Sequence, residues 1–179
     1  MDIQIIAGQV LGIIAMALTI LSMQFRSNRH LFLCQELSGT MFAISFYLLG
    51  AWGGMLMNIF SVIRPELLRR EKIAKSKWTL AALLIMLSLC LAHLALCSTE
   101  KWYLLAAVGA AQAAGTYFMW TQNGKIIRIG QVCCVSPLWI TYNCLLPVPS
   151  IGGIVTEAIN IISIGIALFR YRKTGFTEK

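Results

Sequence analysis

The chain has 179 residues, of which 58% are hydrophobic and only 12% are charged, and its mean hydropathy is +0.75. This composition lies outside the range of ordinary soluble domains and predicts a membrane protein. The formal net charge of +8 does not indicate a nucleic-acid partner, because the basic residues lie between and after apolar segments and form no stripe with interleaved aromatic residues.

Seven apolar segments of about 20 residues use most of the chain, and each is long enough to cross a bilayer. The third is the weakest, because Arg64, Pro65 and Glu66 interrupt its end, and a six-span alternative in which it re-enters the membrane stays open here. No room remains for a separate soluble catalytic domain, so we expect an all-α membrane protein. The segments cover approximately residues 4–24, 31–50, 52–68, 78–97, 102–121, 126–146 and 151–170.

The basic residues predict the orientation of the chain in the membrane. With the N-terminus outside, the outer loops hold only Lys101, and the C-terminus is cytoplasmic. This arrangement requires an odd number of spans, which favours seven over six. The inner loops and the tail then hold all the other basic residues: Arg26, Arg29, Arg64, Arg69, Arg70, Lys72, Lys75, Lys77, Lys125, Arg128, Arg170, Arg172, Lys173 and Lys179.

The chain also contains an internal repeat, because polar residues and glycine pairs recur at matching places in its two halves. The repeat predicts two parallel three-helix bundles joined by a linker helix. We expect a first bundle at residues 1–70, a basic cytoplasmic loop and linker helix at 71–100, and a second bundle with a short tail at 101–179. The matching sets are Gln35, Ser38, Ser45, Phe46, Gly53-Gly54, Asn58 and Ser61, then Gln131, Cys134, Thr141, Tyr142, Gly152-Gly153, Asn160 and Ser163.

Polar residues inside the spans are the candidate binding site for a substrate. Asn58 and Asn160 fall near the bilayer midplane, and amides at that depth need partners. Facing amides can donate and accept hydrogen bonds at once, which suits hydroxyl-rich or zwitterionic solutes. The alternative is that these groups tie helices together, at about 0.6–2 kcal/mol each. The candidate substrate-binding residues are Asn58, Asn160, Glu157, Ser61, Trp139 and Asn143.

Glu157 is the sharpest single candidate among them. A carboxylate inside a span is costly when ionised, so we expect it to be paired or to hold a proton. It could then couple proton movement to solute movement. Arg64 lies nearer the inner side, which argues against direct contact between the two. A carboxyl group hydrogen-bonded to neighbouring helices is the other interpretation.

Gln35, Gln131 and Pro137 are the candidate gate or hinge residues. The spacing of Gln131, Cys134 and Thr141 predicts that they share one helix face, as in the first half. An inner gate and simple solvation at the interface explain the two glutamines equally well. Pro137 removes one backbone hydrogen bond and favours a hinge. No phosphate loop, nucleophile elbow or metal-ligating cluster is present, so we expect neither an enzyme, a cofactor nor a metal site.

Several motifs carry a family resemblance that covers nearly the whole chain. Ser22-Met23-Gln24, the run Phe46 to Asn58, and Ser136 to Asn143 followed by Gly152-Gly153 and Glu157 resemble the bacterial YgjV inner-membrane family. That family is similar to the PQ-loop and SWEET/SemiSWEET transporters, a likeness that implies two parallel three-helix bundles joined by a fourth helix.

The resemblance also implies roles for individual residues. Met23-Gln24 and Thr121-Gln122 occupy the places of the two Pro-Gln motifs of the wider group, and both prolines are missing here. Asn58 and Asn160 resemble the paired asparagines that hold sugar in those transporters.

The leading hypothesis is a small transporter in the bacterial inner membrane that moves a small polar solute by alternating access, with or without a coupled proton. Its partners would be the lipid bilayer and the solute, and the sequence is compatible with a homo-oligomer. The alternative is a non-transporting scaffold or accessory protein that uses the basic segment from Arg69 to Lys77 to contact anionic lipid or a partner. Ordinary positive-inside anchoring also explains that segment.

Overall fold

The computed structural model describes residues 3–48, 52–97, 101–145 and 151–176, and its elements are all helical. One long segment is continuous but changes its winding, from α7 (Gly124–Gly130) through the π-turn η1 (Gln131–Val135) to α8 (Ser136–Leu145). A short helix, α4 (Glu71–Ala74), precedes the fourth long segment. The other long helices are α1 (Ile3–Ser22), α2 (Asn28–Leu48), α3 (Trp52–Arg69), α5 (Lys77–Cys97), α6 (Trp102–Trp120) and α9 (Ile151–Arg170).

These seven long segments begin and end within three residues of the seven predicted spans. Three of them, α1, α2 and α5, are long and apolar enough to cross a membrane by length and composition alone. Helix α3 continues through Pro65 as a single helix of 18 residues. The interruption read from the sequence therefore does not end the helix.

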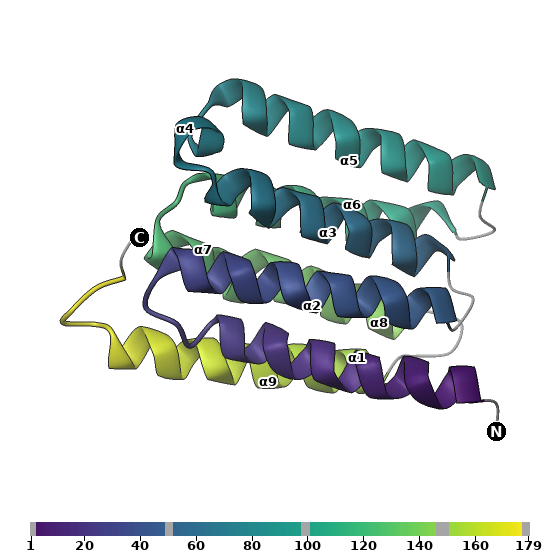
Figure 1. Ribbon diagram of the computed structural model, residues 1–179, viewed down its shortest axis with the longest axis horizontal. Helices are drawn as coiled ribbons and strands as arrows, with labels where there is room; N and C mark the ends of the chain where they lie inside the picture. Colours follow the sequence, from purple (N-terminus) through teal and green to yellow (C-terminus); the bar gives the residue numbers. More distant parts are fainter. Residues whose placement is uncertain (1–2, 49–51, 98–100, 146–150, 177–179) are drawn as a thin grey trace.

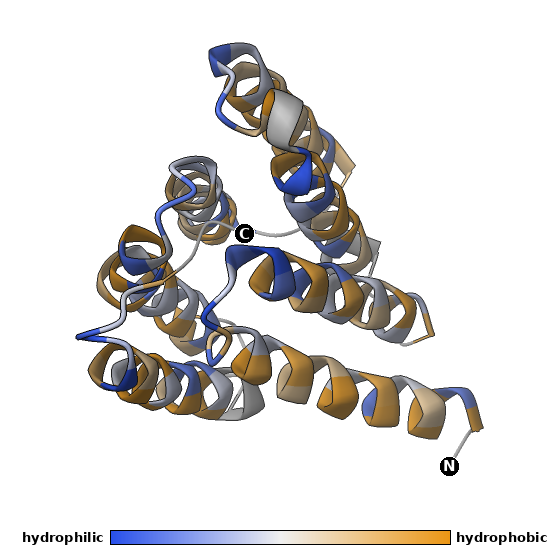
Figure 2. Ribbon diagram, turned by 60° about the vertical axis from the view of Figure 1, so that its left-hand side comes forward, coloured by the Kyte–Doolittle hydropathy of each residue, from blue (hydrophilic) through white to orange (hydrophobic). Residues whose placement is uncertain are grey.

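The outer surface of the helices is apolar, as a lipid environment requires. Leu96 is 86% exposed, Leu89 is 65% exposed and Ile162 is 64% exposed, although a soluble fold would bury such side chains. Figure 2 shows hydrophobic residues along most of each helix and hydrophilic ones gathered mainly at the turns. Trp78 and Trp102 are also highly exposed at opposite ends of the molecule, as amphipathic aromatic residues are at membrane interfaces.

We call α1, α2 and α3 the first group, and α6, the segment from α7 to α8, and α9 the second group. In the first group α2 contacts both α1 and α3, and in the second group α8 contacts both α6 and α9. Helix α5 lies against α3 and α6. Contacts between the two groups include those of α1 with α9 and of α6 with α3. If α1 corresponds to α6, α2 to α8 and α3 to α9, then the contact of α1 with α9 is equivalent to the contact of α6 with α3.

The two ends of the molecule differ. Figure 1 places the N-terminus at one end and the C-terminus at the other, and α1, α3, α6 and α9 run in the same direction. The turns α1–α2, α3–α5 and α6–α7 lie at the end that carries the C-terminus. These turns and the helix ends beside them carry more than half of the 15 Lys and Arg residues, so we call this the basic end; they are Arg26, Arg29, Arg69, Arg70, Lys72, Lys75, Lys77 and Lys125.

The π-turn explains one prediction that was wrong. Pro137 has no N–H to donate to the carbonyl of Cys133, and its ring clashes with that carbonyl in a regular helix. The backbone N–H of Ser136 instead reaches back to the carbonyl of Gln131, which places one extra residue in the turn. An extra residue rotates the following helix by about 100°. Gln131 therefore lines the interior while Thr141 is exposed.

Candidate functional site

A cavity of about 140 Å³ lies between the two groups. Its walls come from α1, α2 and α3 on one side and from α6, the broken segment and α9 on the other. The first group contributes polar side chains that include Gln35, Ser38, Asn58, Ser61 and Arg64. The second group contributes Gln112, Gln131, Trp139, Glu157 and Asn160.

Most of the predicted site residues lie at this cavity, and two do not. Asn143 is absent from its walls, and the Asn143 amide donates a hydrogen bond to the carbonyl of Trp139 in its own helix at 2.8 Å. Pro137 is exposed on the outside of the broken segment and also lies away from the cavity. The prediction of Asn143 as a binding residue therefore has no support in the geometry.

Arg64 lines the cavity although the sequence pattern assigned it to the inner loops. It is only 7% exposed, and its Nη1 donates a hydrogen bond to Oε1 of Gln112 at 2.9 Å. Within the described ranges, its Nε has no hydrogen-bond partner and its guanidinium forms no ion pair. A buried guanidinium without a carboxylate is costly, because loss of water is not offset by an opposite charge.

A glycine on the neighbouring helix makes room for this guanidinium. A Cβ atom added at Gly115 of α6 would lie 3.3 Å from Nη1 of Arg64. Gln112 lies one turn away on the same helix, where it also donates to Oγ of Ser61 at 3.3 Å. Helix α6 therefore both accommodates and orients Arg64.

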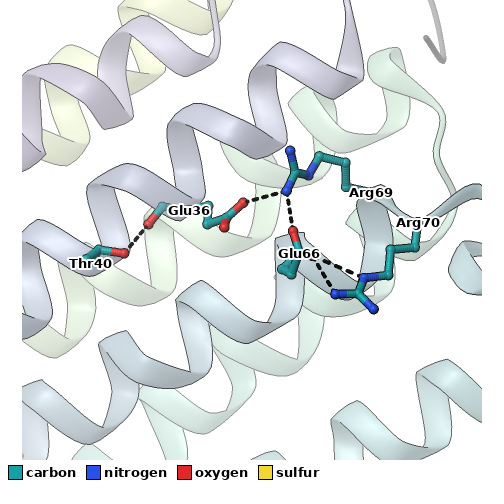
Figure 3. A network of polar contacts seen from close by, with 5 residues as sticks. All are labelled: Glu36, Thr40, Glu66, Arg69 and Arg70. Atoms are coloured by element: carbon teal, nitrogen blue, oxygen red, sulfur yellow. Dashed lines mark hydrogen bonds and ion pairs between the residues drawn. The ribbon is translucent and has the colours of Figure 1, made fainter.

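The next two arginines along the chain, Arg69 and Arg70, have the carboxylate partners that Arg64 lacks. Figure 3 shows Arg69 between Glu36 of α2 and Glu66, and Arg70 bound to Glu66. Nη2 of Arg70 lies 2.8 Å from Oε1 of Glu66, and Nη2 of Arg69 lies 3.4 Å from Oε2 of Glu36. Both cations form ion pairs with carboxylates at the partly exposed basic end. Arg64, deeper in the protein, has none.

Glu157 and Asn160 form the opposite wall. The side chains of Ser136 and Asn160 hydrogen-bond to the Glu157 carboxyl group. Oε2 of Glu157 is nevertheless buried with no hydrogen-bond partner among the described residues, and so is Oδ1 of Asn160. Asn160 is only 1% exposed. Two acceptor oxygens of residues that line one cavity thus lack a donor. A buried acceptor without a hydrogen bond costs about 1–3 kcal/mol.

Asn58 and Ser61 each donate a hydrogen bond to a carbonyl of their own helix. The Asn58 amide donates to the carbonyl of Gly54 at 2.8 Å, and the Ser61 hydroxyl donates to that of Met57 at 3.1 Å. The two asparagines are therefore not equivalent in this structure. Oδ1 of Asn160 has no donor, whereas one N–H of the Asn58 amide is already bound to Gly54.

The two predicted gate glutamines make bonds within their own groups. Gln35 donates to Oγ of Ser22 at 3.0 Å, and Gln131 donates to Oγ of Ser136 at 3.3 Å. Neither bond crosses between the groups, so their gating role stays a prediction.

Two other glutamines bridge the groups at the basic end. Nε2 of Gln24, just after α1, donates to the carbonyl and the hydroxyl of Ser163 in α9, both at 2.6 Å. Nε2 of Gln122, just after α6, donates to the carbonyl of Leu68 in α3 at 3.0 Å. These are equivalent positions of the two groups, and each glutamine reaches the third helix of the other group.

Arg128 adds a third bridge. It is fully buried, its Nε donates to the carbonyl of Met23 at 3.0 Å, and its Nη2 donates to that of Phe25. Phe176 of the C-terminal tail covers the guanidinium, which lies 3.9 Å from the centre of the ring. The turn between α1 and α2 is thereby held by the second group and by the tail.

The sequence contained a signal for Arg64 that the charge count obscured. Asn58, Ser61 and Arg64 are spaced by three residues, so they follow one face of α3. Gln112 is an isolated amide in the middle of an apolar run, which marks it as a buried polar group that requires a partner. Their contact depends on how α3 packs on α6, and the sequence does not give that packing.

These features define a multi-pass helical membrane protein with a buried polar cavity between two groups of helices. The family described as Imp-YgjV, bacterial inner membrane protein, matches residues 6–175, and the chain belongs to this family. It is accordingly a protein of the bacterial inner membrane. Neither the curated proteins nor the solved structures give a match to this chain.

Proposed function

We propose that this protein transports a small polar solute across the inner membrane by alternating access. In this proposal residues 1–70 and 101–179 form two parallel bundles, joined by residues 71–100, that rock against each other around the cavity. The N-terminus is outside and the basic end is cytoplasmic, in agreement with the positive-inside rule.

The observation that carries the proposal is the set of unsatisfied polar atoms at the cavity. Structural polar groups in membrane proteins find partners within the protein, because lipid offers none. Here Nε of Arg64, Oε2 of Glu157 and Oδ1 of Asn160 are all buried without a hydrogen-bond partner in the described residues. These three atoms have almost no exposed surface in this structure, so we propose that a polar solute supplies the missing partners when the two groups move and open the atoms to the cavity.

The bridges at the basic end fit a cytoplasmic gate. In the structure, Gln24 and Gln122 each bind the opposite group, and Arg128 binds the turn between α1 and α2. Opening toward the cytoplasm requires these bonds to break. Each neutral bond of this kind contributes about 1 kcal/mol, which is small enough for thermal opening and closing.

Accessibility of engineered cysteines tests the proposal. Asn58→Cys and Asn160→Cys are placed singly in a chain whose native cysteines are replaced, and a membrane-impermeant thiol reagent is applied to each side of oriented vesicles. A transporter shows labelling from both sides, with a balance that shifts when solute is added. Ser88→Cys on the exposed face of α5 is the control, and it should not respond to solute. Cavity positions that stay closed to both sides would refute transport.

A further inference from the structure

The charges around the cavity carry an inference about the solute. The first group supplies one guanidinium, Arg64, and the second supplies one carboxyl group, Glu157. Both line the same cavity, yet no ion pair joins them in the described part of the chain. We propose that the solute is a small zwitterion whose carboxylate binds Arg64 and whose ammonium group binds Glu157 and Asn160. This proposal rests on the transport function above and specifies its substrate class.

The Arg64 side is built to receive a carboxylate. A guanidinium presents five N–H donors in a planar fork, a geometry that matches a carboxylate with two parallel bonds. Nη1 is occupied by Gln112, whereas Nε faces no partner. The bond from Gln112 and the space left by Gly115 fix the orientation of the fork. An anionic group therefore meets an oriented cation that has unused donors.

The Glu157 side is built to receive an ammonium group. In this proposal Glu157 is ionised when the solute is bound, so its unused atom Oε2 and Oδ1 of Asn160 are both acceptors, and an ammonium group has three donors and no acceptor. A hydroxyl-rich solute would bring acceptors as well as donors to this wall. The all-acceptor character of these two atoms favours a cation here.

Overall charge supports the same assignment. A solute with a single charge would leave one of the two protein charges buried without a partner, which costs several kcal/mol. A zwitterion neutralises both at once. The size also fits, because 140 Å³ is well below the range of about 300–1,000 Å³ that is usual for drug-sized ligands. We therefore expect a short amino acid rather than a large one or a disaccharide.

Equilibrium binding to the purified full-length protein in nanodiscs tests this assignment. The probes are radiolabelled glycine, β-alanine and γ-aminobutyrate, whose charges are separated by one, two and three methylene groups. Propionate, ethylamine and glycerol serve as competitors that carry only the anion, only the cation or neither. At least one zwitterion should bind at least tenfold more tightly than every competitor, because hydrogen bonds to charged groups contribute about 1.5–3 kcal/mol each.

Two variants separate the two ends of the solute. Arg64→Gln should weaken the best zwitterion at least tenfold and remove competition by propionate while keeping that by ethylamine. Glu157→Gln should also weaken the best zwitterion at least tenfold, but it should remove competition by ethylamine while keeping that by propionate. Loss of fold cannot produce this crossed pattern, since it would remove all binding together. Arg70→Gln and Glu36→Gln, which alter charges of the basic end outside the cavity, are the matched controls and should leave binding unchanged.

Three results would overturn the proposal that the solute is a zwitterion. The first is tighter binding of glycerol than of all three amino acids. The second is the same loss of propionate and ethylamine competition in both variants. The third is no binding of any amino acid. If cysteine labelling at the cavity still alternates between the sides, transport stands and only the substrate class is wrong. If labelling does not alternate, the proposed function itself fails.

Discussion

The two groups of helices have the same packing order but opposite polar chemistry. The first brings a guanidinium to the cavity on an uninterrupted α3, and its middle helix α2 is regular. The second brings a carboxyl group on α9, and its middle segment is broken by the π-turn before Pro137. The two walls of the cavity therefore differ in the ionisable group that each presents, Arg64 on one and Glu157 on the other.

The largest expected effect comes from removing this difference. Arg64→Glu would place two carboxyl groups at one small cavity and remove the cation proposed to bind the solute carboxylate, whose hydrogen bonds to a charged group contribute about 1.5–3 kcal/mol each. We expect uptake of the best-bound amino acid into proteoliposomes to fall at least about 100-fold. The double variant Arg64→Glu with Glu157→Arg should recover part of it, because it exchanges the two walls. If the double variant folds but does not recover uptake, the result would argue against paired subsites.

A second effect concerns the space that orients Arg64. Gly115→Val places a methyl-bearing side chain where even a Cβ lies 3.3 Å from Nη1. Overpacking of this kind costs about 1–3 kcal/mol, so we expect a lower unfolding temperature and weaker amino-acid binding. Gly165→Val is the matched control, since a Cβ there meets nothing within 4 Å. Equal behaviour of both variants in thermal unfolding and binding would contradict this role of Gly115.

A smaller effect tests the equivalence of the two groups at the basic end. Gln24→Ala and Gln122→Ala each remove one bridge to the opposite group, at about 1 kcal/mol. Both should increase labelling of a cysteine at position 58 from the cytoplasmic side, to a similar degree. Gln9→Ala, at an exposed position of α1, should not. A response to only one of the two bridging variants would show that the gate is not symmetric.

The smallest effect concerns the broken middle segment. Pro137→Ala restores the missing N–H and removes the clash with the preceding turn. We expect amide hydrogen exchange across residues 131–136 to slow by a few fold, as a regular helix replaces the π-turn. Amides of α2 in the same sample provide the internal reference. Unchanged exchange would mean that packing around the segment, and not Pro137, maintains the π-turn.

The sequence predicted the helices well because their lengths are set by local properties. An apolar run of about 20 residues is recognised without any knowledge of its neighbours, and the seven spans were confirmed as helices. Helical spacing also brought Asn58, Ser61, Glu157 and Asn160 to one cavity, since their polar faces turn toward the opposite group.

What the sequence did not predict depends on contacts between distant segments. The bond from Arg64 to Gln112 requires α3 to lie against α6, and the reach of Gln24 to Ser163 requires α1 to lie against α9. The rotation that exposes Thr141 arises from a single extra residue in a turn. Hydrophobic patterns do not record any of these. The division into two bundles and the roles of the site residues stay predictions.

The buried side chain of Arg128 has a consequence for how the chain is made. The carbonyls of Met23 and Phe25 receive their donors from a residue that is synthesised about a hundred positions later. During synthesis this turn therefore lacks these donors until α7 has been made. We expect a chain that ends before α7 to hold the turn between α1 and α2 less firmly than the full chain does.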